Sequence, residues 1–343
     1  MTAAEFLSRL EGERYLALDV ELEPVGSPTI QPTTFANTGP SFYEAPDGQL
    51  AAVVDSVASM ANQLELTIWD EAACEPTRPV APLPWVKVVD ADGSYYTSSR
   101  RAAHRLNAGS LMNGVTDEGE LFGSRVERLA GDAKPPVHRR LAEVVWEHDP
   151  LGVIHGCWFA GIWDGRARLT RALSARIDAL GVQSQSAQIG GQKSRDALDE
   201  PGSVDDMGFK TVRGEAPYYT AEVSASRIVS PIVLDLALLR SYGLSQEAYR
   251  ALVATGVLQI AELIAAWPRR RSRCILDVRD VTVRRPAGLA FPGIDELRDG
   301  FVSELRDECF SRCQAATGVE KAEPLIVRWT PRSARGSGGS RQQ

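Results

Sequence analysis

The sequence is poor in the residues that build disulfide frameworks and metal sites. Its 343 residues include five scattered cysteines, an odd number that excludes a scaffold held together by disulfides. Cys309 and Cys313 lie one helical turn apart without further ligands nearby, so we expect buried thiols. The four histidines form no HExxH or paired-ligand spacing. We therefore expect no metal and no other cofactor.

Long apolar runs and a targeting signal are also missing. No stretch approaches the roughly 20 apolar residues of a membrane span. The amino terminus, MTAAEFLSRLEGERYLALDV, lacks a basic flank followed by an apolar core. The sequence therefore predicts a cytoplasmic protein that makes no contact with a membrane.

The familiar catalytic signatures are absent too. The chain has no GxSxG elbow, no Walker loop and no GxGxxG after a strand. His155 is a candidate general base, but a single histidine in an apolar segment is more often a hydrogen-bonded core residue. The pair Asp205 and Asp206 lies in a polar loop, where carboxylates are usually solvated. These absences favour a protein that is not an enzyme.

Charge is distributed unevenly along the chain. The net charge of −7 argues against nucleic-acid binding when taken alone. Residues 1–75, however, carry two arginines against thirteen acidic residues, whereas residues 268–343 carry fifteen basic residues against ten acidic ones. A groove that follows phosphates needs only a local basic patch, so nucleic acid remains a candidate ligand.

Apolar spacing predicts an alternation of strands and helices. Strands are expected at 14–25, 151–163, 273–285 and 323–330 and at the start of 218–239, with a hairpin at 83–99 turning at Asp92-Gly93. Helices are expected at 53–72, 138–149, 168–182, 245–267 and 293–316, although a strand could replace the first turn of 168–182. This order fits an α+β fold with an RRM-like, or ferredoxin-like, sheet that carries packed helices on one face.

Two polar segments have unusual composition. In SVASMANQLE, Ser56, Ser59 and Asn62, with Gln63 beside them, form a helix face of small hydroxyls and amides that a polynucleotide backbone can approach closely. In TSSRRAAHRLN, a hydroxyl cap is expected to start a short helix on which Arg101, His104 and Arg105 share a face. Such a face suits phosphate oxygens, although a solvated basic surface paired with the acidic amino-terminal region would have the same composition.

The order and spacing of these two segments, after an RRM-like first strand and the stretch IQPTTFANTGPSFYEAPDG, resemble a family. The sequence is similar to the backbone subunit of type I CRISPR Cascade surveillance complexes, in the branch of subtype I-G (formerly I-U) of the RAMP superfamily. The resemblance implies one RRM-like palm over residues 1–331, with large finger (73–150) and thumb (183–217) insertions. A disordered tail is expected at 332–343.

The resemblance also implies a function and a set of contacts. Several copies stack head to tail along a crRNA and present it for pairing with target DNA. The other partners are a large subunit, a processing or capping subunit and a helicase-nuclease. Matching motif by motif gives the RNA-binding residues Ser56, Ser59, Asn62, Gln63, Ser98, Ser99, Arg100, Arg101, His104, Arg105 and Asn107. Met207 and Phe209 are candidate thumb wedges, placed on loop character alone.

Two departures and two alternatives accompany this reading. Ala58 and Gln63 differ from the Gln and Arg that relatives often carry, which puts those individual contacts in doubt. Related RAMP subunits cut target RNA with a loop aspartate and a divalent metal, for which Asp19 and Asp47 are the nearest candidates here. The other alternative is an unrelated α/β metabolic enzyme.

Overall fold

The centre of the molecule is an antiparallel sheet with the strand order β16-β1-β15-β14-β5-β4. The computed structural model describes residues 1–35, 39–191, 218–268 and 274–330. The sheet strands are β1 (Tyr15–Pro24), β4 (Phe42–Glu44), β5 (Leu50–Asp55), β14 (Ile177–Gly191), β15 (Tyr218–Asp235) and β16 (Leu276–Arg285), and the short β13 (Leu173–Ala175) also pairs with β15.

The chain order of these elements identifies the fold. Two helices separate the four principal strands, giving β1-α2-β14-β15-α8-β16, with α2 at Val57–Leu66 and α8 at Gln246–Ala265. In the sheet the same strands lie side by side as fourth, first, third and second, and every neighbouring pair is antiparallel. This is the order of a ferredoxin-like sheet, so the predicted α+β, RRM-like class is confirmed.

Strand β1 lies at the centre because its sequence alternates. Leu16, Leu18 and Val20 have no exposed surface, whereas Asp19 and Glu21 on the opposite face are partly exposed. The aliphatic face packs beneath helix α8, and the polar face is left open to solvent and to ion pairs. β1 was predicted at 14–25, and the structure confirms it within one residue.

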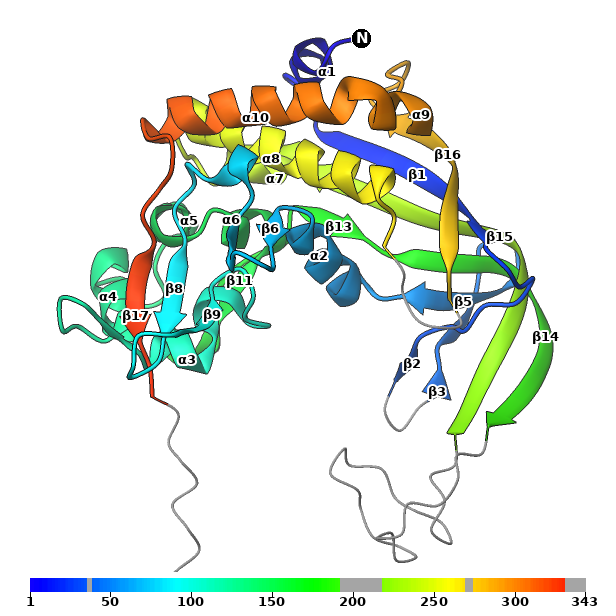
Figure 1. Ribbon diagram of the computed structural model, residues 1–343, viewed down its shortest axis with the longest axis horizontal. Coiled ribbons are helices and arrows are strands. Elements are labelled where there is room, and N and C mark those ends of the chain that lie inside the picture. Colours follow the sequence, from blue (N-terminus) through cyan, green and yellow to red (C-terminus); the bar gives the residue numbers. More distant parts are fainter. Residues whose placement is uncertain (36–38, 192–217, 269–273, 331–343) are drawn as a thin grey trace, which may run out of the picture.

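Helix α8 is the buried core helix. Its apolar residues occupy nearly its whole circumference, and it is covered by the sheet on one side and by α10 (Val302–Thr317) on another (Figure 1). Gly256 allows close approach, because a Cβ there would meet Leu234 of β15 at 3.1 Å. Length and composition alone would let α8 cross a membrane, but 78% of its apolar window is buried inside the fold.

The long insertion between α2 and β14 builds a second sheet, the finger sheet, with the order β10-β17-β8-β9. Its strands are β8 (Val86–Val89), β9 (Tyr95–Ser98), β10 (Val115–Thr116) and β17 (Leu325–Arg328). Helices α3 (Gly109–Met112), α4 (Phe122–Ala130), α5 (His138–His148) and α6 (Leu151–His155) belong to the same insertion. The predicted last strand, β17, comes from the carboxyl-terminal part of the chain. It pairs in parallel with β8 and does not join the central sheet (Figure 1).

Three predicted elements were wrong in type or extent. The helix expected at 53–72 begins only at Val57, because 50–55 form β5, and it ends at Leu66. The strand expected at 151–163 divides into α6 and β11 (Cys157–Phe159), which pairs with β12 (Ala167–Leu169). The helix expected at 168–182 consists instead of β12, β13 and the start of β14.

Short elements complete the chain. They are α1 (Ala3–Arg9), α7 (Leu236–Ser241), α9 (Ile294–Glu296) and the strand pairs β2 (Thr34–Phe35) with β3 (Gly39–Pro40) and β6 (Trp69–Asp70) with β7 (Glu75–Pro76).

Strands β14 and β15 continue as a pair beyond the main sheet, on the opposite side of α2 from the finger sheet (Figure 1). This hairpin begins where the thumb was predicted, at 183–217. Residues 192–217, which include the predicted wedges Met207 and Phe209, lie outside the described residues, as does the predicted tail.

Candidate nucleic-acid interface

Helix α2 presents the polar face that the sequence predicts. The Ser56 hydroxyl caps the helix by accepting a hydrogen bond from the backbone N–H of Ser59 at 3.2 Å. Met60, Ala61 and Leu64 turn into the core, while Asn62 is exposed and Ser59 and Gln63 are partly exposed. Small polar groups therefore line the outer side of α2, without a long charged side chain among them.

The segment TSSRRAAHRLN does not form the predicted helix. β9 ends at Ser98, turns follow, and a single 3₁₀ turn covers Arg105–Asn107. The regular face expected for Arg101, His104 and Arg105 therefore does not exist. These side chains point in different directions, and their contacts decide what each one does.

Ser98, Ser99 and Arg100 lie inside the protein, which corrects their predicted role in RNA contact. Both serines have no exposed surface and Arg100 retains 5%. The Ser99 hydroxyl donates to Asp149 at 2.5 Å, and the Arg100 guanidinium lies 3.5 Å from the same carboxylate. Burial raises the pKa of Asp149, and Arg100 acts against that rise. These residues fix the turn to the end of α5.

Arg105 joins the two polar segments. Its guanidinium donates two hydrogen bonds to the Glu65 carboxylate of α2, at 2.7 and 2.6 Å. Both side chains are largely buried, with 13% and 7% of their surface exposed. Burial raises the pKa of Glu65, while Arg105 acts against the rise. SVASMANQLE and TSSRRAAHRLN are thus held together by the last residue of one and an arginine of the other.

Arg171 makes a second connection to α2. It donates to the backbone carbonyls of Val57, at 3.3 Å, and His155, at 3.2 Å. Burial lowers the pKa of Arg171, and the nearby Arg105 contributes to the lowering. Arg171 therefore contacts the first residue of α2, and Arg105 contacts Glu65 near its end.

These residues open onto a cleft of about 520 Å³, which we call the basic cleft. It is lined by Ala103, His104, Arg105, Asn107, His155, Gly156, Cys157, Trp158, Ala160, Arg168, Leu169 and Arg171. None of these lining residues is acidic, in a chain whose net charge is −7. Arg168 and His104 are exposed, and no carboxylate pairs with either of them within the part of the chain that the structure describes. The cleft therefore gathers three arginines without an acidic lining residue.

The remaining predicted residues lie around this cleft. Asn107 lines it, whereas Arg101 pairs with Glu71 at 2.9 Å on the surface. His155 retains 1% exposure, interacts with Gln259 at 3.2 Å, and burial holds its pKa well below the ordinary value. His155 is therefore a hydrogen-bonded core residue.

Sequence reasoning missed three residues of the cleft: Trp158, Arg168 and Arg171. Trp158 and Arg168 project outward from β11 and β12, between inward-facing neighbours. The alternation of buried and exposed positions in CWF and ARL carried that signal. It was obscured because both stretches were assigned to longer elements.

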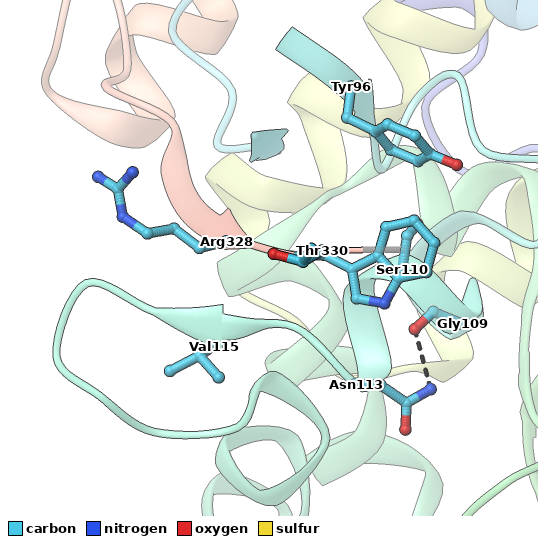
Figure 2. Close-up of a pocket in the computed structure, with 8 residues that line it drawn as sticks. Tyr96, Gly109, Ser110, Asn113, Val115, Arg328 and Thr330 are labelled. Carbon is cyan, nitrogen blue, oxygen red and sulfur yellow. Dashed lines mark hydrogen bonds between the residues drawn. The ribbon is translucent and has the colours of Figure 1, made fainter. Parts of the chain in front are cut away.

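A larger groove of about 1060 Å³ lies on the finger sheet (Figure 2). Tyr96 and Trp329 line it, with ring centroids 5.0 Å apart. Asn113 donates to the Gly109 carbonyl at 2.9 Å, and the cation at its rim, Arg328, is paired with Asp117 at 3.1 Å. Since that charge is already neutralised, this groove is less suited to phosphate than the basic cleft.

The aspartates of the nuclease alternative are engaged elsewhere. Asp19 pairs with Arg284 at 3.0 Å, and Asp47 accepts a hydrogen bond from the backbone N–H of Gln49 at 3.0 Å. In residues 1–35, 39–191, 218–268 and 274–330 no group of three or more His, Cys, Asp or Glu side chains is arranged to hold a metal ion. Cys309 and Cys313 are buried thiols 3.8 Å apart, as predicted.

Comparison with known proteins identifies a relative over the first half of the chain. Residues 16–184, just under half of the chain, match the family model described as CRISPR-associated protein GSU0053. This match spans α2, both polar segments and the basic cleft, and it agrees with the CRISPR-associated resemblance of the sequence. No curated protein matches the chain.

Two solved structures show a distant likeness. A chain of a CRISPR RNA-guided surveillance complex, pre-nicking, is 12% identical, with 92% of this chain and 96% of that chain covered and a TM-score of 0.37. Csc2 of Thermofilum pendens is 10% identical, with 90% and 83% covered and a TM-score of 0.27. Scores this low establish no shared fold, and the fold described above follows from the strand order alone.

Proposed function

We propose that this chain, which matches a family of CRISPR-associated proteins over residues 16–184, is a non-catalytic crRNA-binding backbone subunit of a type I interference complex. One observation carries the proposal. Two polar segments within the family match meet at the Arg105–Glu65 pair, and the second of them lines a cleft that contains three arginines and no acidic residue.

The chemistry of this surface suits a guide whose sequence varies. A subunit that binds every spacer must rely on phosphate, ribose and stacking contacts, because base edges differ from guide to guide. On α2 we assign this contact to Ser56, Ser59, Asn62 and Gln63, in the cleft to His104, Arg105 and Asn107, and outside it to Arg101. Arg168 and Arg171 join this set, and the buried Ser98, Ser99 and Arg100 leave it.

The proposal includes partners and location. Several copies line one crRNA head to tail in the cytoplasm, so a modest patch in each copy is multiplied along the strand. The acidic amino-terminal region of one copy meets the basic carboxyl-terminal region of the next. The assembled guide pairs with target DNA, and a large subunit, a processing or capping subunit and a helicase-nuclease complete the system.

Co-expression of the chain with a CRISPR array and the neighbouring subunits tests the proposal. We expect a complex that contains RNA of uniform length. Arg168→Glu places an anion in the cleft, so RNA occupancy falls and the salt slope of binding decreases by about one unit. Arg139→Glu, at an exposed position of α5, is the matched charge control and leaves both unchanged.

Two outcomes contradict the proposal. Purification of a nucleic-acid-free monomer under these conditions would remove its basis. Equal RNA occupancy of wild type, Arg168→Glu and Arg139→Glu across a salt titration would show that the cleft is not the contact surface.

A further inference from the structure

Trp158 is an exposed aromatic residue at the edge of the basic cleft. It lies on β11, whose other residues, Cys157 and Phe159, are buried against the core. Trp158 itself retains 59% of its surface exposed. Single exposed apolar side chains are common on protein surfaces, so the meaning of this one depends on how its ring is held and on what surrounds it.

The indole is fixed in place. Its Nε1–H donates to the backbone carbonyl of Gly165 at 2.7 Å, across the turn that joins β11 to β12. That turn has three consecutive residues with positive φ, at Trp163, Asp164 and Gly165. The buried Trp163 ring packs edge-on against Phe159, with centroids 5.7 Å apart. The hairpin therefore presents a preformed aromatic surface, so little conformational entropy of the indole is lost when a ligand binds.

Three arginines line the cleft that Trp158 borders. Arg168 lies directly opposite Trp158 in the β11–β12 register, and both residues are on the exposed side of this hairpin. His104, Arg105 and Arg171 line the same cleft, and no acidic residue does. An aromatic surface beside an exposed guanidinium group, here that of Arg168, is a combination that single-stranded nucleic acids bind, with a base on the ring and a phosphate on the cation.

We propose that Trp158 is a stacking platform for one unpaired base of the RNA in each copy of the chain, with Arg168 contacting an adjacent phosphate. The inference rests on the proposed function and adds a specific nucleotide contact to it. The contact is independent of sequence, because every base has a face that can stack.

Fluorescence anisotropy of the full-length chain with a labelled oligomer of about 12 uridines measures the contact. Trp158→Ala should weaken binding about tenfold, and Trp158→Phe should retain most of the affinity because a ring remains. A ribose-phosphate oligomer of the same length without bases separates stacking from charge. Trp158→Ala should leave its binding unchanged, whereas Arg168→Glu should weaken both oligomers.

The outcomes separate this inference from the proposed function. Uridine binding that is equal in wild type and Trp158→Ala overturns the inference alone, as does an equal loss with the base-free oligomer. A tryptophan-dependent contact seen only with a thymidine DNA oligomer overturns the assignment to the guide. Wild-type protein that binds no RNA oligomer overturns the proposed function as well.

Discussion

Arg105 shows what a single residue's surroundings can change. Its spacing with Arg101 and His104 predicted a solvent-facing basic surface, but its guanidinium turns back onto Glu65 of α2. The sequence contains both residues within the two segments that carry the family resemblance. The sequence does not reveal that they pair, because hydrophobic periodicity reports only local structure and these two residues are 40 positions apart.

Removing Arg105 should destabilise the fold. Arg105→Ala leaves the Glu65 carboxylate buried without its partner, and we expect the free energy of unfolding to fall by about 3–5 kcal/mol. Arg101→Ala removes an ion pair in which 36% of the arginine and 59% of the glutamate side chain are exposed, so it should cost no more than about 1 kcal/mol. Urea denaturation measures both, and equal costs would show that the Arg105–Glu65 pair does not anchor the segment.

Elements were predictable in proportion to how clearly their apolar residues repeat. The predictions came close to the observed bounds for β1, α5, α8 and β16, because a single spacing of apolar residues dominates each of these elements. Residues 168–182 were mistaken for a helix, since their apolar positions fit spacings of both two and three or four. In the structure Leu173, Ala175, Ile177 and Ala179 are all buried, and this spacing of two is the alternation of a strand.

Strand β14 depends on a glycine, Gly181, at its bend. Gly181 lies where β14 leaves its partner β5, with φ at +61°, and a Cβ there would meet the Ser226 Oγ at 2.1 Å. Gly181→Ala should therefore cost more than the roughly 1–2 kcal/mol of a left-handed alanine alone. Gly12→Ala supplies the control, because Gly12 has φ at +83° and nothing within 4 Å.

Thermal denaturation of the two alanine variants compares them directly. We expect a lower midpoint for Gly181→Ala than for Gly12→Ala, together with faster amide exchange in β14 next to the substitution. Identical midpoints would mean that the bend at the base of the hairpin tolerates a side chain and that the crowding at Ser226 is relieved without cost.

At the scale of the whole molecule, net charge was a poor guide to the surface. The chain is acidic overall, yet the basic cleft has no acidic lining residue. The sequence predicted the fold class, the polar face of α2 and the segment that borders the cleft. It did not predict Trp158, Arg168 and Arg171, because only the folded hairpin and the base of α2 bring them together.

The stability of the whole fold should depend on pH through two buried histidines. Burial lowers the pKa of His148 and, more strongly, of His155. His155 faces Arg105, Arg171 and Gln259, while His148 bonds the Val144 carbonyl and lies near Arg125, Glu147 and Asp149. The unfolded chain takes up protons near the ordinary histidine pKa of about 6.5, before the folded chain does.

The stabilisation that neutral histidines provide is therefore complete above about pH 6.5 and is lost as the pH falls toward their lowered pKa values. His155→Gln keeps an amide within reach of Gln259 but cannot titrate. We expect it to flatten the decline of the urea midpoint between about pH 7 and pH 5, while exposed His138→Gln retains the wild-type slope. If the urea midpoints of His155→Gln and wild type fell in parallel, protonation of His155 would not be the cause of the acid destabilisation. The buried carboxylates Glu65 and Asp149 could not be its cause either. Burial raises the pKa of both carboxylates, so their stabilising effect increases as the pH falls.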